Sequence, residues 1–184
     1  MRAAIAIVLA LSAAGCGAAH HAGRTEPLPP GVRPVGPGPR YQPRLGPQRV
    51  RDCRPGLGER VGVHLELFAN RFVVIFPAGI GTRAPRRGLG GRIESARCYG
   101  PLVTIDPTGL VLLRPGVRAT VGDVFAQWGQ PLGAGFRGRV RAWVGGREVH
   151  GDPAAIPLRR HAEIVLEVGG HVPPHHAYTF PSGF

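Results

Sequence analysis

The sequence predicts an α+β fold that is mainly β, with a small antiparallel or mixed sheet and one short helix. Three observations predict it. Short apolar runs separated by turn residues begin after Arg54, and the segment from Val121 to Trp128 has a helical period instead. This helix follows an early strand pair and precedes a late one, which is the order of elements in a β-grasp-like domain.

The first strand and its turn are predicted from residues 61–76. Apolar residues occupy alternate positions from Val61 to Leu67, which is the period of a half-buried strand. Asn70-Arg71 precedes the apolar run from Phe72 to Phe76, and asparagine tolerates a left-handed backbone. We therefore expect a hairpin with its tip near Asn70, followed by a Gly- and Arg-rich loop over residues 77–91.

A second hairpin and the helix follow. Strands are expected over 102–105 and 110–113, because the four residues between them carry Pro and Gly at favourable turn positions. Thr120 is a good N-cap, with Asp123 three residues later to accept from the first turn. One face of the helix is apolar, and Gly129 and Pro131 end it; the apolar residues are Val121, Val124, Phe125 and Trp128.

The late strands lie between residues 138 and 168. Alternation over 138–144 leads to a Gly145-Gly146 turn and a return over 147–149. A tight connection at 156–158 precedes the final strand at 163–168. An antiparallel β-sandwich is the rival architecture, and the helix after Thr120 disfavours it.

The N-terminus has the layout of an export signal over residues 1–15. Its apolar run from Ala3 to Ala14 is too short to cross a bilayer as a permanent helix. The segment from Leu11 to Cys16 resembles the bacterial lipobox, which implies a lipid on Cys16 and attachment to the outer face of a cell membrane. The alternative is an ordinary secretory signal cut nearby, which would leave Cys16 removed or free.

Residues 16–55 are predicted to be a disordered tether that precedes a single β-rich domain over 56–184. The tether is proline-rich, and between Gly17 and Pro55 seven arginines face only two carboxylates, Glu26 and Asp52. Such a segment buries too little surface to offset the entropy of ordering it. A sharper alternative is that its arginines grip anionic lipid headgroups or wall polymers.

Charge and cysteine content limit the interpretation further. The 23 basic residues are all arginine, and the net charge is +12. Because lysine is absent, the arginine excess has the look of a GC-rich coding bias, and its functional weight is discounted.

With Cys16 lipidated, Cys53 and Cys98 remain as a pair, and a disulfide is expected outside the cytoplasm; two free thiols are the alternative.

Several motifs occur in order along the folded part of the chain. They are Cys53, Gly62-Val63-His64-Leu65, Phe76-Pro77-Ala78-Gly79-Ile80-Gly81, Cys98 with Leu102-Val103-Thr104-Ile105-Asp106, the segment from Thr120 to Leu132, and Ile156-Pro157-Leu158-Arg159-Arg160-His161. In this order they resemble a family of exported, histidine-rich prokaryotic proteins of unknown function. The family pattern has a cysteine, His-x-His-x-His-Leu, Val-Pro-Ala-Gly-Ile-Gly, Cys-x-x-x-Leu-His-Thr-His-Asp, a Gly-Ile-Ile-His strand, Trp-Gly-Gln-Pro-Leu and Ile-Pro-Leu-x-x-His.

The resemblance implies a metal site in the family that this chain has largely lost. Clustered histidines on adjacent strands suit copper or zinc. Here Val103 and Ile105 stand where two of the histidines would be, Leu112 falls near another, and only His64 remains of the first triplet. The sequence is therefore interpreted as a divergent member, with no cofactor expected.

A residual copper or zinc site is the runner-up function. Its candidate ligands are His64, His161, His171, His175 and His176. The alternative is that His161 is a structural turn residue and that the tail histidines are solvated, since their spacing matches no known zinc pattern.

An anion-binding surface is the other candidate site. Only Glu94 balances the arginines of the predicted loop and its flank, which are Arg83, Arg86, Arg87, Arg92 and Arg97. They could dock an anionic envelope polymer, a phospholipid surface or an acidic protein patch, or they could simply be solvated on a mobile loop. Nucleic acid is not expected, because aromatic residues do not interleave with the arginines.

Catalysis has little support in the sequence. Beyond the signal, the serines are Ser95 and Ser182, and neither lies in a Gly-x-Ser-x-Gly elbow. Asp106, Asp123 and Asp152 have turn or capping roles as their simplest explanation. The sequence therefore predicts a non-catalytic cell-envelope lipoprotein whose folded domain is a binding or interaction module.

Overall fold

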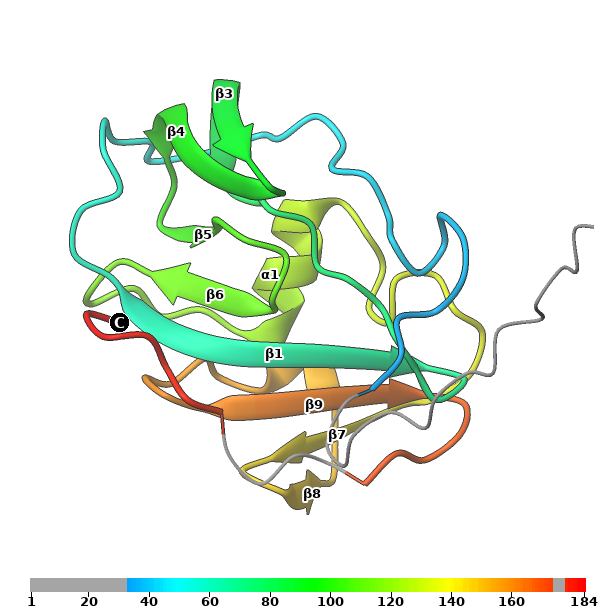
Figure 1. The fold of residues 1–184 in the computed structure, drawn as a ribbon. Coiled ribbons are helices and arrows are strands. Elements are labelled where there is room, and N and C mark those ends of the chain that lie inside the picture. The colour runs from blue at the N-terminus through cyan, green and yellow to red at the C-terminus, as the bar shows by residue number, and fades with distance from the viewer. Residues whose placement is uncertain (1–32, 174–177) are drawn as a thin grey trace, which may run out of the picture.

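The computed structural model describes residues 33–173 and 178–184, which form a mainly β fold with one short helix (Figure 1). No helix in these ranges is long and apolar enough to span a membrane. The elements in chain order are β1 (Val61–Ala69), β2 (Phe72–Val73), β3 (Thr82–Leu89), β4 (Arg92–Tyr99), β5 (Leu102–Thr104), β6 (Leu110–Leu113), α1 (Val121–Trp128), β7 (Val140–Val144), β8 (Arg147–Val149), a 3-10 turn (Pro153–Ala155) and β9 (Glu163–Val168).

The main sheet has the strand order β5-β6-β1-β9-β7-β8, with β2 added to β1. Its centre is the parallel pair β1 and β9, in which His64 aligns with Glu163 and Ala69 with Val168, whereas the flanking pairs are antiparallel. A first and last strand that lie side by side and parallel, with the helix between them in sequence, make the arrangement β-grasp-like. The parallel pair and the helix against the sheet confirm the predicted class over a β-sandwich.

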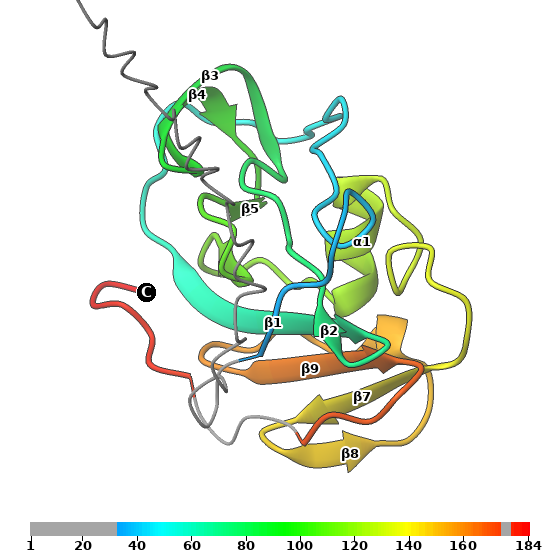
Figure 2. The ribbon, with the colours of Figure 1, turned by 45° about the vertical axis from the view of Figure 1, so that its right-hand side comes forward.

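The main hydrophobic core lies between α1 and one face of the sheet (Figures 1 and 2). From the sheet it takes Val63, Leu65 and Leu67 of β1 and Ile164 and Leu166 of β9, all fully buried. The helix contributes the four residues that its period predicted: Val121, Val124, Phe125 and Trp128.

The helix ends follow from local chemistry as predicted. The Thr120 side chain accepts from the Asp123 amide and the Asp123 carboxylate accepts from the Thr120 amide at 2.7 Å, which is a capping box. Gly129 takes the left-handed conformation that ends the helix, with φ 78°.

The last residue of the Pro-Ala-Gly-Ile-Gly segment, Gly81, occupies a position that only glycine can fill. Its φ is +71°, and a Cβ there would lie 1.8 Å from the Leu102 carbonyl oxygen. Only glycine fits so close to the neighbouring backbone.

The prediction that β1 is half-buried is wrong, because both faces of the sheet are covered. His64 and Phe68, on the face opposite α1, are as inaccessible as the apolar residues beside them. The C-terminal segment from Tyr178 to Phe184, red in Figures 1 and 2, lies near the start of β1 and packs there against a second apolar cluster.

The predicted loop over 77–91 is also wrong in its second half. Residues 82–99 form the two-stranded sheet β3–β4, which turns at Gly90 and Gly91, both with positive φ. Most of this hairpin is exposed, so its strands carry no apolar alternation that would have predicted them.

The hairpin predicted at Asn70 is present, with left-handed Asn70 and Arg71, but its return strand is only Phe72–Val73.

Part of the predicted disordered tether is ordered, because residues 33–55 pack on the domain. Val35 bridges to Val73, Tyr41 lies against Phe72 and Phe136 with ring centroids 5.9 and 4.9 Å apart, and Val50 is buried. A few widely spaced apolar side chains provide this packing. They were not recognised in the sequence because the segment as a whole is proline-rich. The ordered fold therefore extends well before the predicted boundary at residue 56.

The predicted disulfide joins Cys53 to Cys98 of β4, 45 positions apart in sequence. It fixes the end of the ordered N-terminal segment to the β3–β4 hairpin. Beside it, Arg54 and Tyr99 exchange backbone hydrogen bonds of 3.0 and 2.8 Å.

Removing this crosslink by Cys53→Ser with Cys98→Ser should lower the free energy of unfolding by about 3 to 4 kcal/mol, because the unfolded chain regains the entropy of a loop of about 46 residues. Denaturant unfolding with and without reducing agent measures it. Reductant should destabilise the wild type by a similar amount and leave the double variant unchanged. Equal stability of the two proteins under oxidising conditions would contradict the role assigned to the disulfide.

Candidate functional site

The positions that the family resemblance assigns to histidines lie together on the face of the sheet opposite α1. Val103, Ile105 and Leu112 are at most 4% exposed there, and they form one apolar cluster with Tyr99 and Leu110. Tyr178, Phe180 and Phe184 of the C-terminal segment pack against this cluster. A surface filled by hydrocarbon offers no ligand to a metal.

His64 lies on the same face and is buried. Its Nε2 atom is 3.1 Å from the Thr108 carbonyl oxygen, and its ring stacks on Tyr178 with centroids 3.7 Å apart. Burial raises the pKa of the Tyr178 hydroxyl. The sequence placed His64 on the polar side of its strand, whereas the C-terminal segment has made that side part of the interior.

The other described candidate histidines lie in separate contacts. His161 stacks on Phe180, and its Nε2 is 2.6 Å from the Phe184 carbonyl oxygen. His171 Nδ1 is 2.9 Å from a carboxylate oxygen of Glu167. Within residues 33–173 and 178–184, no group of three His, Cys, Asp or Glu side chains is placed to hold a metal, and His175 and His176 lie outside these ranges.

Three of the five candidate arginines of the hairpin have internal partners. Arg83 donates to the Val50 carbonyl at 3.3 Å, and Arg86 donates to the Thr82 hydroxyl and carbonyl at 2.7 and 2.6 Å. Arg92 forms an ion pair with Asp106 at 3.5 Å. Burial lowers the pKa of Arg86 from its usual value.

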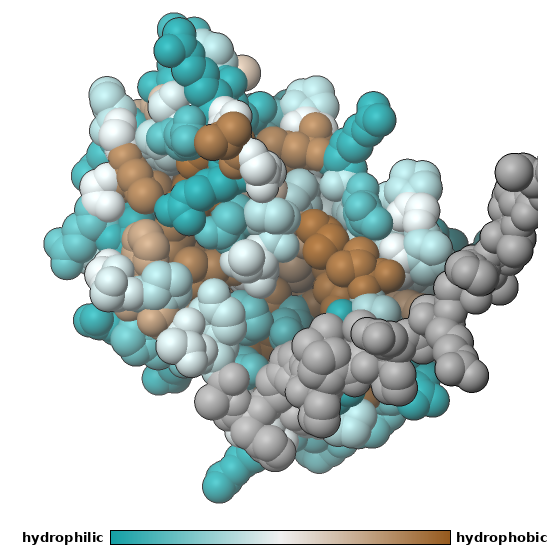
Figure 3. Space-filling view, in the orientation of Figure 1, coloured by the Kyte–Doolittle hydropathy of each residue, from teal (hydrophilic) through white to brown (hydrophobic). Residues whose placement is uncertain are grey.

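The two remaining hairpin arginines, Arg87 and Arg97, are exposed. The part of the β3–β4 hairpin at the top of the space-filling view is largely hydrophilic (Figure 3). The predicted set of five therefore divides into three anchoring side chains and two that face solvent.

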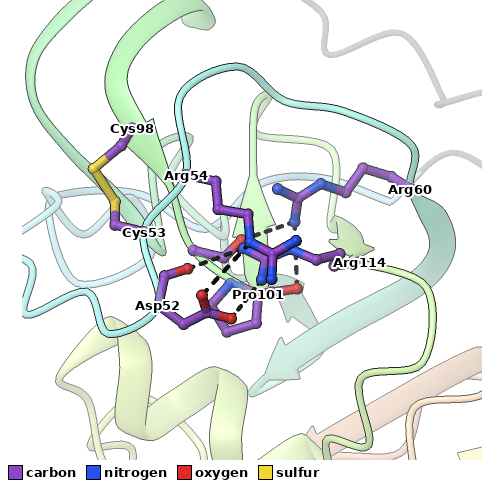
Figure 4. Close-up of polar contacts among 8 residues, drawn as sticks. Asp52, Cys53, Arg54, Arg60, Cys98, Pro101 and Arg114 are labelled. Carbon is purple, nitrogen blue, oxygen red and sulfur yellow. Dashed lines mark hydrogen bonds and ion pairs between the residues drawn. A yellow bond between two sulfur atoms is a disulfide. The ribbon is translucent and has the colours of Figure 1, made fainter.

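Figure 4 shows a further arginine cluster beside the disulfide. Arg114 donates to the carboxylate of Asp52 and, at 2.9 Å, to its carbonyl oxygen, and the hydrogen bond to the carboxylate lowers the pKa of Asp52. Arg60 is 4% exposed and donates to the carbonyl oxygens of Leu57 and Gly100 at 2.7 and 2.9 Å. This cluster joins the N-terminal segment to the sheet and has a structural role.

Arg60 is charged despite its burial. Desolvation lowers its pKa to about 10, and the nearby positive charge of Arg114 acts in the same direction. At neutral pH the guanidinium is therefore still protonated and donates to backbone carbonyls that would otherwise be unsatisfied.

A basic groove, which the sequence did not predict, runs beside α1. It has a volume of about 700 Å³, and its polar rim is formed by Arg49, Arg51, Arg118, Asp123 and Gln127. Leu102, Val117 and Ala119 are among the apolar residues that line it. None of the three arginines forms an ion pair within the part of the chain that the structure describes.

The sequence missed this groove because one of its walls was assigned to the tether. Arg49 and Arg51 were counted among the arginines of a disordered segment. The only local signal was Val50, a β-branched residue between two arginines and close to Cys53, which is the pattern of an extended segment with one face inward.

The two serines among the described residues both lie in exposed segments. Ser95 lies opposite Arg87 on the exposed β3–β4 hairpin, and Ser182 is exposed in the C-terminal segment. Neither side chain contacts a histidine or a carboxylate within the described residues.

Replacing the buried guanidinium by Arg60→Ala should lower the free energy of unfolding by about 2 to 3 kcal/mol, because it removes charge-assisted hydrogen bonds to buried carbonyls. Arg54→Ala is the matched control: its side chain is 65% exposed and ion-paired at 3.6 Å, so the change should be below about 0.5 kcal/mol. Denaturant unfolding at pH 7 measures both. If both variants lost the same free energy of unfolding, the burial of Arg60 would not be the cause of its contribution to stability.

Comparisons of the chain with protein-family models, with curated proteins and with solved structures find no match.

Proposed function

We propose that the protein is a non-catalytic lipoprotein of the cell envelope, and that its folded domain binds an anionic partner. The excess of arginine in the composition carries little weight by itself; the observation that carries this proposal is how few of the arginines are paired in the structure. The net charge of the whole chain is +12, and in the described residues only Arg54, Arg92, Arg114 and Arg141 form ion pairs with carboxylates. A surface of this kind attracts anions and raises their local concentration.

The contacts of the candidate carboxylates support a non-catalytic role. Asp106 accepts from the Thr108 amide at 3.3 Å, Asp123 completes the capping box of α1, and Asp152 accepts from the Ala154 amide at 2.9 Å. Each therefore holds a turn or a helix end, which is the ordinary use of aspartate in such places.

The packing of the second sheet face supports loss of the ancestral metal chemistry. If the chain is a divergent member of the histidine-rich family, the apolar residues Val103, Ile105 and Leu112 stand at or near positions of former metal ligands. Their side chains now pack against the C-terminal segment. We infer that the scaffold was retained while its chemistry changed from coordination to apolar packing.

An extracytoplasmic address agrees with the disulfide between Cys53 and Cys98, since such crosslinks persist in oxidising compartments. Attachment through a lipid on Cys16 remains our proposal from the lipobox-like segment. Two or three acyl chains give stable membrane attachment.

Mass spectrometry of the mature N-terminus should find Cys16 as the first residue, with acyl chains attached. A Cys16→Ala variant should leave the membrane fraction, because the attachment depends on those chains. A variant that stays in the membrane fraction after a high-salt wash would refute lipid anchoring, and the same wash removes protein held only by its arginines.

Parallel titrations of the mature protein distinguish an anion-binding module from a metal-binding protein. Long-chain polyphosphate should bind saturably, and the affinity should fall as sodium chloride rises from 0.05 to 0.5 M, because salt screens exposed charge with a Debye length of about 10 Å at 0.1 M. Copper(II) and zinc(II) should show no tight stoichiometric binding. Tight metal binding abolished by His64→Ala, without polyanion binding, would reverse the assignment.

A further inference from the structure

We propose that the basic groove beside α1 is the binding site for an unbranched polyanion, a polymer that repeats phosphate or carboxylate groups along its length. The inference rests on the proposed function, to which it adds a location and a ligand class. It starts from the two walls of the groove, one formed by α1 and the other by residues 47–51.

The wall formed by residues 47–51 is held in place at several points. The Gln48 side-chain oxygen accepts from the Gly81 amide at 3.0 Å, and Gln127 of α1 donates to the Arg49 carbonyl at 3.2 Å. The Val50 side chain is buried over Gly100, where a Cβ would meet it at 2.7 Å. Cys53 then fixes the following residues to β4.

This anchoring places two arginine side chains at the groove. In an extended segment, successive side chains point to opposite sides. Val50 is buried, whereas its neighbours Arg49 and Arg51 are exposed and line the groove. The anchored backbone therefore holds the bases of both arginine side chains at the groove before a ligand arrives, which reduces the backbone entropy lost on binding.

The third guanidinium lies beyond the other end of the helix. Arg118 precedes the N-cap Thr120, whereas Arg49 is bonded through its backbone to Gln127 in the last turn. An eight-residue helix is about 12 Å long, so the positive charges are spread along the groove. A chain of repeated anions can contact arginines at both ends of such a groove at once.

The groove supplies no anion of its own to these arginines. Asp123 is the carboxylate on its rim among the described residues, and it accepts from the Thr120 amide at 2.7 Å and hydroxyl at 3.0 Å. Those bonds hold it to the helix cap. Arg49, Arg51 and Arg118 are therefore available to the oxyanions of a ligand, which guanidinium binds by paired hydrogen bonds.

The lining of the groove selects among polyanions. Within the described residues, no aromatic side chain lines it, so nucleobases find no stacking surface. The groove is concave, and a flat bilayer does not reach into it. The ligand is therefore recognised by its repeated charge.

The test compares variants of the mature protein in titrations with polyphosphate and with polygalacturonate, which carry phosphate and carboxylate respectively. Arg49→Ser with Arg51→Ser should weaken binding of at least one polymer about tenfold or more. Arg139→Ser with Arg147→Ser removes the same charge from exposed positions on and before the β7–β8 hairpin and should have less than about a twofold effect.

A second variant avoids removing any arginine. Ala126→Glu places a carboxylate on the exposed side of α1 inside the groove and should cause a similar loss by repulsion. Inorganic phosphate at equal phosphate concentration should not compete. Thermal unfolding verifies that each variant is folded, and phosphatidylglycerol vesicles, which present the same anion on a flat surface, should bind wild type and groove variants equally.

The outcomes separate the two proposals. If the wild type binds neither polymer, both the proposed function and this inference fail. If the wild type binds polymers, and Arg87→Ser with Arg97→Ser lowers the affinity while the groove variants do not, the groove is the wrong location. The binding function then stands. If inorganic phosphate competes fully, or if vesicle binding alone depends on Arg49 and Arg51, the polymer class is wrong.

Discussion

The structure depends on the parallel pairing of β1 with β9, which places the first and last strands of the sheet side by side. Along six aligned pairs, from His64–Glu163 to Ala69–Val168, these strands occupy the centre, and both of their faces are buried. The other strands of the main sheet extend this pair on both sides. α1 covers one face of the sheet, and the C-terminal segment with the β3–β4 hairpin covers part of the other. Most side chains of the central pair are therefore used in packing.

Covering the second face changes what its residues can do. Among the described residues of β1, His64 is the histidine on that face, and its ring lies against Tyr178 with Nε2 near the Thr108 carbonyl oxygen in a buried environment. Its apolar neighbours provide packing and no ligand atoms. The arginines at the edges of the sheet and along α1 are, by contrast, exposed to solvent in several places.

The parts of the fold with strong local signals could be predicted from sequence. The helix from Val121 to Trp128 combined an N-cap, a period of 3.6 and a C-terminal glycine, and the central strands had apolar runs between turn residues. The β3–β4 hairpin could not be predicted, because an exposed ribbon needs no apolar alternation. The groove could not be predicted either, since Arg49 and Arg118 are far apart in sequence and line the same groove only in the folded chain.

The position of Cys53 also determines how the molecule responds to mechanical load. If Cys16 is fixed in a bilayer, a pull on the body is transmitted through the chain that precedes residue 53. Residues 33–52 are held by scattered contacts and would detach from the domain first. Detachment would stop at residue 53, because the disulfide to Cys98 transmits the force to the β3–β4 hairpin. The central strands would thus be shielded from tension by one covalent bond at the border of the fold.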